Sequence, residues 1–335
     1  MSDDASPQAP PDAPTPGRRR VIFKGVVQLA LGLALFAGLV WWVSPPWDEL
    51  RDTIDLHPQW LCLSLLGSAF ATVVTAARWK MLSETMGAGR LPYGIYFHYL
   101  ALTRVIGQVL PTVLVDVLGR GAALKAAGSD SRLGQLITPV VLERLIDLLL
   151  PLALLAWALA VHLDAIPWID PWLSLGLCTA VFVALAIALM EPLVGLALWA
   201  YGTLRRLRRR DRSLARPKAP RVDPPLAARI VGLSVLRYAG ILVQYWGAGA
   251  GLGVLLAPLV LVSAAPLAQL AGLVGITPGG LGVQEGGWAA ALHQLGQREA
   301  HIVVFMAGTR LMMSVNFGIL SLLSWPWRGK RTESA

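Results

Sequence analysis

Long apolar runs separated by short polar connections dominate the pattern of hydrophobic and polar positions along this chain of 335 residues. A helix that crosses a membrane needs about 20 predominantly apolar residues, and six runs have this character. They predict membrane-spanning helices near residues 25–43, 59–77, 133–161, 172–190, 226–250 and 301–325. We therefore expect an all-α, polytopic helical membrane protein.

Two further apolar regions, residues 96–118 and 254–295, are interrupted by residues that break helices. Glycine and proline in such clusters cannot continue a helix. The breaking residues are Gly107, Pro111, Pro278, Gly279, Gly280 and Gly282. We expect each region to form a re-entrant hairpin that returns to the side it left, the first from the cytoplasmic side and the second from the opposite side. Broken backbone at membrane depth is tolerated only beside protein or a water-filled cavity, so both breaks should line one site.

Positive charge is distributed unequally over the connections between these segments. On one side they carry 22 Lys and Arg residues, whereas Arg51 and Arg298 alone lie on the other side. The positive-inside rule then places both termini in the cytoplasm. The first apolar run follows an arginine cluster and could be a cleavable or twin-arginine signal. It is too long and lacks a small-residue cleavage site, so an anchor helix is favoured.

The composition leaves little room for a soluble domain, since 55% of the residues are hydrophobic and 15% are charged, against about 25% charged in soluble domains. We expect a disordered cytoplasmic tail over 1–20, a membrane domain over 21–325 and a cytoplasmic tail over 326–335. The polybasic connection 203–225 either fixes the topology, binds anionic lipid or docks a partner protein. The net charge of +9 is explained by topology, so no nucleic-acid partner is expected.

The two halves of the membrane domain contain the same elements in opposite orientation. Residues 21–163 provide two spans, a hairpin and a third span, and residues 172–325 repeat this order upside down. An inverted repeat whose broken helices meet near the bilayer midplane is a recurring plan of transporters. The sequence therefore predicts about six full spans and two re-entrant hairpins, arranged as an inverted repeat.

Several ionisable side chains fall inside the predicted membrane segments. They are Arg104, Asp116, Arg120, Glu143, Arg144, Asp147, Arg237, Glu285 and Arg310. Each costs about 2.5–3.5 kcal/mol at the bilayer centre on insertion scales, so a chain that keeps several is expected to use them. Glu143 and Asp147 share a helix face, and Arg144 can pair with a hairpin carboxylate such as Asp116 or Glu285. The alternative is a set of buried ion pairs that only hold the hairpins in place.

The functional interpretation is a site for an anionic headgroup. Arg144 and Arg310 occupy matching positions in the two halves and are expected to bind a phosphate in a bidentate manner. The N-termini of the hairpin helices would add backbone N–H donors. Asp116 and Glu285 would balance charge or couple protons beside Glu143 and Asp147, and Arg120 would either join the site or extend to the cytoplasmic surface.

No pattern of residues predicts a catalytic site, a metal site or a cofactor. Cys62 and Cys178 cannot form a zinc motif or a disulfide framework, and the five histidines have no ligand spacing. The stretch from Gly279 to Gly282 lacks the remainder of a nucleotide-binding loop.

Four motifs together resemble the lysylphosphatidylglycerol synthase transmembrane-region family over roughly residues 20–325. They are Gly107-x3-Pro111-x4-Asp116-x3-Arg120, Glu143-Arg144-x2-Asp147, Pro278-Gly-Gly-Leu-Gly-Val-x-Glu285-Gly with Arg310, and Arg78-Trp79. The resemblance implies an integral inner-membrane protein. The corresponding region of two-domain relatives is similar to a flippase for aminoacylated phosphatidylglycerol, and other relatives are associated with hopanoid or polyprenyl-linked glycan pathways.

This chain departs from the family pattern in two places. Residues 112–115 are Thr-Val-Leu-Val where a relative would show glycines, so the first hairpin is expected to be less sharply broken. Only ten residues follow the last predicted span, which leaves no room for a soluble aminoacyl-transferase domain, so synthase activity is not expected. We expect a transporter of an anionic phospholipid or a polyprenyl- or hopanoid-type lipid. The alternatives are a scaffold for a lipid- or glycan-modifying enzyme and a membrane-embedded transferase.

Overall fold

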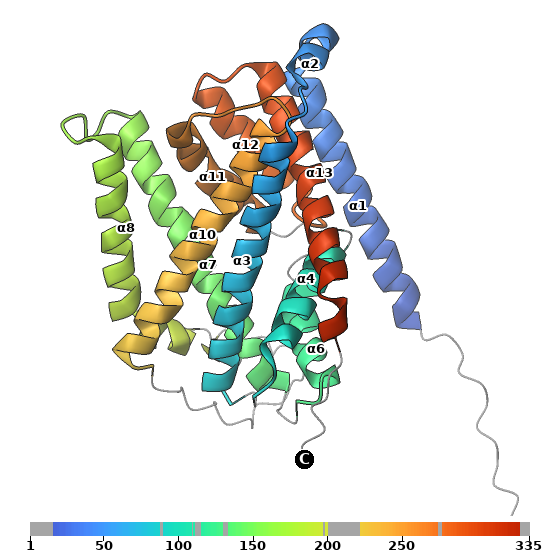
Figure 1. The fold of residues 1–335 in the computed structure, drawn as a ribbon, viewed down its shortest axis with the longest axis vertical. Helices are drawn as coiled ribbons and strands as arrows, with labels where there is room; N and C mark the ends of the chain where they lie inside the picture. Colours follow the sequence, from blue (N-terminus) through green and yellow to red (C-terminus); the bar gives the residue numbers. More distant parts are fainter. Residues whose placement is uncertain are drawn as a thin grey trace, which may run out of the picture.

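The computed structural model describes residues 16–87, 90–108, 110, 115–129, 133–196, 198–199, 222–273 and 277–328, and these form a helical bundle (Figure 1). Pro111, most of the polybasic connection and the outer parts of both tails lie outside the described residues.

Six long helices form the body of the molecule. They are α1 (Pro16–Val43), α3 (Pro58–Thr85), α7 (Leu133–His162), α8 (Pro171–Ala188), α10 (Pro224–Ala250) and α13 (Glu299–Leu323). All six are long and apolar enough to cross a membrane, which confirms the six predicted spans. Proline at the first turn favours the start of α3, α8 and α10, since its missing N–H has no partner there in any case. Two short helices, α2 (Trp47–Thr53) and η2 (Trp325–Trp327), lie beside them.

Helix α3 corrects one feature of the sequence prediction. The predicted span ended at residue 77 because Arg78 was counted as a charge of the cytoplasmic connection. The helix continues to Thr85, and Arg78 lies inside it with a fully buried side chain. Other buried polar groups of the protein accept hydrogen bonds from its guanidinium group. A hydropathy pattern cannot show these partners, because they lie on other helices.

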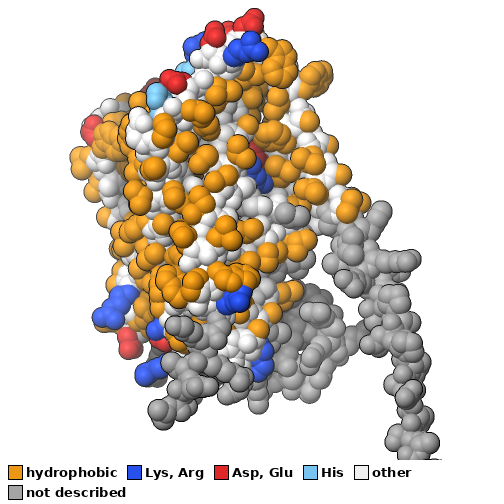
Figure 2. All heavy atoms as spheres, turned by 45° about the vertical axis from the view of Figure 1, so that its right-hand side comes forward, with side chains coloured by type: hydrophobic (Ala, Val, Ile, Leu, Met, Phe, Trp, Pro, Cys, Tyr) orange, Lys and Arg blue, Asp and Glu red, His pale blue; other side chains and the backbone are white. Residues whose placement is uncertain are grey.

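The outer surface between the two ends of the bundle is mostly hydrophobic (Figure 2). Leu177, Val181 and Leu185 of α8, for example, are all more than half exposed. Charged side chains on the visible face gather mainly toward the two ends. A hydrophobic surface that surrounds the bundle between two charged ends is typical of helices that face lipid, since apolar patches this large are rare on soluble monomers. The chain is a multi-pass membrane protein.

The two interrupted regions form helical hairpins. In the first, α4 (Tyr93–Gly107) packs against the π-helical turn η1 (Val115–Gly119) and against α6 (Arg120–Ala126). In the second, α11 (Pro258–Leu273) packs along α12 (Val283–Gln294). They occupy opposite halves of the bundle in Figure 1.

The turn of the second hairpin meets the end of α4 of the first hairpin inside the bundle. A Cβ atom added at Gly279 would lie 3.2 Å from the carbonyl oxygen of Gly107 and 3.3 Å from Oε1 of Gln108. Gly279 also has a φ of +58°, which a glycine adopts without strain. The break of the second hairpin is therefore held directly against the end of α4.

The two halves pack against each other in a reciprocal way. Among the described helices, α3 and α10 make the most extensive contact, and they hold the same place in the two halves. Helix α4 of the first hairpin packs on α13, and α11 of the second hairpin packs on α7, so each hairpin lies against the last helix of the other half. Each of α1, α3 and α7 runs opposite to its counterpart α8, α10 or α13 (Figure 1). This is the packing that the predicted inverted repeat requires.

Candidate functional site

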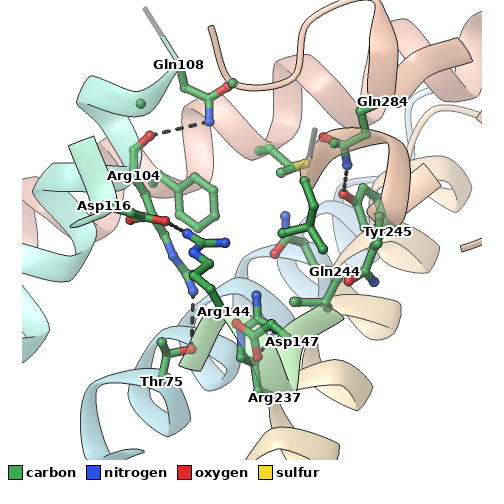
Figure 3. Close-up of a pocket in the computed structure, with 18 of the residues that line it drawn as sticks. Thr75, Arg104, Gln108, Asp116, Arg144, Asp147, Arg237, Gln244, Tyr245 and Gln284 are labelled. Atoms are coloured by element: carbon green, nitrogen blue, oxygen red, sulfur yellow. Dashed lines mark hydrogen bonds and ion pairs between the residues drawn. The ribbon is translucent and has the colours of Figure 1, made fainter. Parts of the chain in front are cut away.

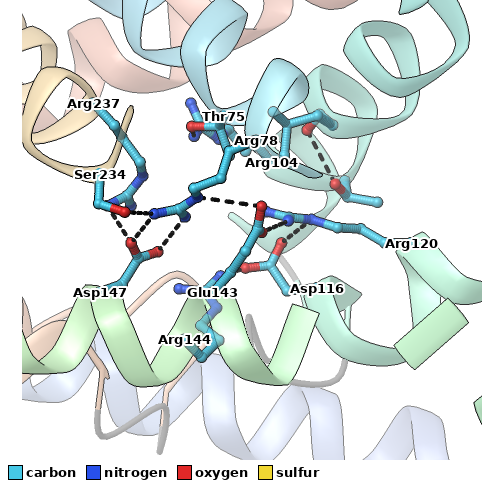
Figure 4. Close-up of polar contacts among 12 residues, drawn as sticks. Thr75, Arg78, Arg104, Asp116, Arg120, Glu143, Arg144, Asp147, Ser234 and Arg237 are labelled. Atoms are coloured by element: carbon cyan, nitrogen blue, oxygen red, sulfur yellow. Dashed lines mark hydrogen bonds and ion pairs between the residues drawn. The ribbon is translucent and has the colours of Figure 1, made fainter. Parts of the chain in front are cut away.

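A buried network of ion pairs is centred on α7. Glu143 and Asp147 are one helical turn apart, and both face Arg78 of α3 (Figure 4). Arg78 donates two hydrogen bonds to Asp147, of 2.8 and 3.1 Å, and its Nε lies 3.4 Å from Glu143. It also donates to Ser234 of α10 at 2.7 Å. One guanidinium group thus joins three helices, and its planar arrangement of donors is suited to this geometry.

The network continues from α7 to the first hairpin. Arg120, at the start of α6, donates to Glu143 at 2.6 Å, and its Nε lies 3.4 Å from Asp116. Asp116 also pairs with Arg144, as predicted from the sequence. Arg120 is 3% exposed, so it belongs to the interior and does not extend to the cytoplasmic surface. Its guanidinium group also lies over the ring of Trp79.

Asp116 owes its position to the π-helical turn η1. A π-helical turn inserts one extra residue per turn, and such turns occur mainly at functional sites. The turn leads directly into α6, so Asp116 and Arg120 lie one turn apart and both reach the α7 network. The first hairpin is anchored to α7 through these two side chains.

Two further arginines lie at the edge of the network. Arg237 of α10 pairs with Asp147 at 3.2 Å. Arg104 of α4 forms no ion pair with any described carboxylate; it donates to the hydroxyl groups of Thr72 and Thr75 at 3.0 and 3.3 Å. Its guanidinium carbon lies 5.0 Å from the ring centre of Phe317. Its charge is therefore less compensated than that of the other arginines.

A cavity of about 180 Å³ opens where the two hairpin turns, α7 and α10 come together (Figure 3). Its charged lining residues are Arg104, Asp116, Arg120, Arg144, Asp147 and Arg237. The second hairpin contributes uncharged lining residues, among them Gln269, Gly279 and Gln284. Arg144 is the most exposed of the paired arginines that line the cavity, with 29% of its side chain accessible. The cavity thus offers guanidinium donors at the junction of the two hairpins.

Glu285 and Arg310, both predicted as site residues, contact the turn of the second hairpin and are not among the described residues that line the cavity. Glu285 accepts a hydrogen bond of 2.7 Å from the backbone N–H of Gly282, so it caps its own helix α12. Arg310 donates to the carbonyl oxygens of Gly279 and Pro278, and its Nε lies 3.4 Å from Glu285. Both side chains therefore stabilise the turn of the second hairpin through these contacts. The N-terminus of α12 is partly occupied by this cap, so it is not the free anion donor that we expected.

The structure therefore separates the predicted site residues into two groups. Arg144, Asp147, Asp116 and Arg120 line the cavity, while Glu143 lies behind them and Glu285 and Arg310 support the turn beside it. Of the predicted break residues, Gly107 and Gly279 line the cavity and Gly282 contacts α1.

Sequence reasoning missed two kinds of functional side chain. Arg78 was assigned to a connection, although an arginine flanked by Ala77 and Trp79 at the end of a long apolar run was a possible signal. The polar lining residues Gln108, Gln244, Gln269 and Gln284 were passed over. Uncharged amides inside apolar runs were the available signal, because polar side chains at membrane depth normally face protein or water.

Comparison with known proteins agrees with this geometry. No curated protein matches the chain. The model of one family, described as the lysylphosphatidylglycerol synthase TM region, matches residues 29–320. This match covers every long helix except the start of α1 and the end of α13, together with both hairpins and the whole arginine–carboxylate network. The chain therefore belongs to the lysylphosphatidylglycerol synthase transmembrane-region family.

Proposed function

We propose that this membrane protein moves an anionic lipid, or an anionic lipid-linked intermediate, between the two leaflets of an inner membrane. Both termini would lie in the cytoplasm, and both hairpins would re-enter the bilayer from opposite faces. The observation that carries the proposal is the arginine-lined cavity at the point where the hairpin turns meet, inside a bundle with a hydrophobic outer surface.

The charge of this cavity supports an anionic cargo. Guanidinium groups bind phosphate oxygens through paired, charge-assisted hydrogen bonds. Arg104 and Arg144 are the best placed, since Arg104 has only hydroxyl partners and Arg144 keeps part of its side chain accessible. Arg78 and Glu143 are fully engaged behind the cavity wall and provide its framework.

The position of the cavity supports movement across the bilayer. Helical hairpins that meet from opposite faces provide two thin barriers in place of one full-length wall. A headgroup bound between them would exchange sides when one hairpin shifts relative to α7 or α13, the helices on which the hairpins pack. The family name points to a lipid derived from phosphatidylglycerol, which carries an anionic phosphate diester.

The experiment is a lipid-exchange assay with purified protein in liposomes. A fluorescent phosphatidylglycerol is placed in both leaflets, and dithionite then bleaches the outer one. Wild-type protein should expose the inner pool to bleaching faster than empty liposomes do. Arg144→Gln should slow this exchange by about 10-fold, because one charge-assisted hydrogen bond contributes about 1.5–3 kcal/mol.

The control variant is Arg298→Gln, since Arg298 is exposed and pairs only weakly with Glu49, at 3.5 Å. It should exchange lipid at the wild-type rate. Equal rates for wild type and Arg144→Gln, or for wild type and empty liposomes, would contradict the proposal.

A further inference from the structure

The ionisable groups around the cavity do not balance. Among the described residues, six guanidinium groups and four carboxylates form the central network, so two positive charges are in excess. They are Arg78, Arg104, Arg120, Arg144, Arg237 and Arg310 against Asp116, Glu143, Asp147 and Glu285. The residues of the two hairpin turns that lie outside the described ranges, 109, 111–114 and 274–276, are all uncharged in the sequence. Buried charge of one sign is costly unless an opposite charge is bound.

Unused hydrogen-bonding atoms in the cavity wall point to the same kind of ligand. Among the described lining residues, two buried donors form neither a hydrogen bond nor an ion pair: Nε of Arg237 and Nε2 of Gln269. Nε of Arg120 also forms no hydrogen bond and has only the 3.4 Å ion pair with Asp116. One buried acceptor, Oε1 of Gln108, is also without a hydrogen bond. Buried polar groups are normally satisfied. An excess of donors over acceptors fits a ligand that is rich in acceptor oxygens.

The size of the cavity limits that ligand. Its volume of about 180 Å³ corresponds to about six water molecules at about 30 Å³ each. Pockets for larger organic ligands usually measure about 300–1,000 Å³. A phosphate group with its nearest ester atoms fits this volume.

We propose that the cavity recognises a phosphate monoester in its doubly charged form, such as a lipid that ends in phosphate, in preference to a phosphate diester. This inference rests on the proposed function and specifies its cargo. A dianion neutralises both excess positive charges, while a diester with one negative charge leaves one uncompensated. The three terminal oxygens of a monoester also provide more acceptors for Arg104, Arg144 and Gln269 than the two terminal oxygens of a diester.

The test measures binding to purified full-length protein in detergent. Dioctanoyl phosphatidic acid provides a monoester, dioctanoyl phosphatidylglycerol provides a diester with the same chains, and inorganic phosphate provides the group without chains. At about pH 8 phosphatidic acid should bind about 10-fold more tightly than phosphatidylglycerol, because the extra charge strengthens at least one hydrogen bond by a charge-assisted amount.

Acidification provides a second measurement. The second proton of a phosphate monoester has a pKa near 6, so at about pH 5 phosphatidic acid carries one charge and its advantage should disappear. The titratable groups that line the cavity are Arg104, Asp116, Arg120, Arg144, Asp147, Arg237 and Tyr245. Phosphatidylglycerol has no such transition, so its affinity reports any effect of pH on these groups. A preference that persists at low pH would overturn the proposal.

A variant of Gln269 distinguishes an effect on ligand affinity from an effect on the stability of the fold. Gln269→Met keeps a similar volume and removes a buried donor that has no partner, so the unfolding temperature should stay the same or rise. The affinity for phosphatidic acid should nevertheless fall several-fold. Arg298→Gln should leave both quantities unchanged. An unchanged affinity of the Gln269→Met variant would count against the proposed ligand position.

These measurements distinguish the two proposals from each other. Tighter binding of phosphatidylglycerol than of phosphatidic acid would overturn the monoester and leave the lipid transporter intact. Binding of inorganic phosphate with no added affinity from acyl chains would support the monoester chemistry and contradict a lipid as its source. Absence of binding for all three probes would contradict both proposals.

Discussion

Arg78 bonds to groups on two other helices, and its removal affects all of them. Its side chain is fully buried, and its partners Asp147 and Glu143 are buried as well. Three buried charges stabilise the fold only while they remain together, because each alone would lie in a medium of low polarity. We therefore assign Arg78 to the framework of the site, behind Arg104 and Arg144, for which we propose contact with the ligand.

Replacement of Arg78 should destabilise the protein severely. Arg78→Ala leaves Asp147 with Arg237 and Glu143 with Arg120 as their remaining partners, so the loss should be about 3–5 kcal/mol, as for other broken buried pairs. Arg78→Lys should restore little of it, since an ammonium group cannot reproduce the two hydrogen bonds to Asp147. Thermal unfolding in detergent measures both.

Lys80 provides the matched control two residues along α3. It pairs with Glu84 at the surface, where both side chains are about one third exposed. Lys80→Ala should cost less than about 1 kcal/mol. Equal unfolding temperatures for the Arg78 and Lys80 variants would refute the framework role.

At the scale of elements, the turn of the second hairpin packs closely against α1. Gly282 has a φ of +79°, and a Cβ atom there would lie 2.5 Å from Cβ of Leu35 on α1. Gly32 of α1 contacts the neighbouring Leu281 in the same way, with 3.1 Å between its added Cβ and that of Leu281. Backbone conformation and close approach therefore both require glycine at position 282.

An alanine at this position should disturb both the turn and α1. Gly282→Ala combines a strained left-handed conformation, about 1–3 kcal/mol, with the clash against Leu35. Gly286→Ala lies one turn further along α12, where the added methyl group would make an ordinary contact of 3.6 Å with Leu39. It should be neutral or stabilise α12 by up to about 1 kcal/mol. Unfolding temperatures in detergent should separate the two variants clearly; the same temperature for both would show that α1 does not depend on this turn.

For the whole molecule, the alternating directions of the six long helices bring the start of α1 and the end of α13 to the same end of the bundle (Figure 1). The connection after α7 lies at the other end, and the end of α6 lies at the same end of the bundle as the end of α13. With the excess of Lys and Arg on one side of the membrane, this arrangement predicts that the end of α6 faces the cytoplasm.

Cysteine labelling in intact cells measures this orientation. In a background with Cys62→Ser and Cys178→Ser, the exposed positions Ala126 and Ala165 are each replaced by cysteine. A maleimide that cannot cross the membrane should label Ala165→Cys directly and Ala126→Cys only after permeabilisation. The reverse pattern would invert the topology, and labelling of both in intact cells would contradict a barrier between the two positions.

The break in the first hairpin could be predicted from the sequence, whereas the contacts of Arg310 could not. Gly107 and Pro111 sufficed to predict the first break, since both residues disfavour a continuing helix, and α4 ends at Gly107. Arg310 was assigned to a headgroup because it matches Arg144 in the repeat. In the structure its donors reach Gly279, Pro278 and Glu285. Equivalent positions in the two halves thus acquired different partners, which no comparison of spacing could reveal.

The sequence by itself determined the helical membrane class, the six spans, the two breaks and the presence of buried charges. Each of these follows from local composition, because bilayer thickness sets the length of an apolar run and glycine and proline limit a helix within a few residues. Only the tertiary structure decided which charges pair, that Arg78 is buried and that the hairpin turns meet. These depend on helices distant along the chain, and the energy of a buried charge is set by the groups that surround it in space.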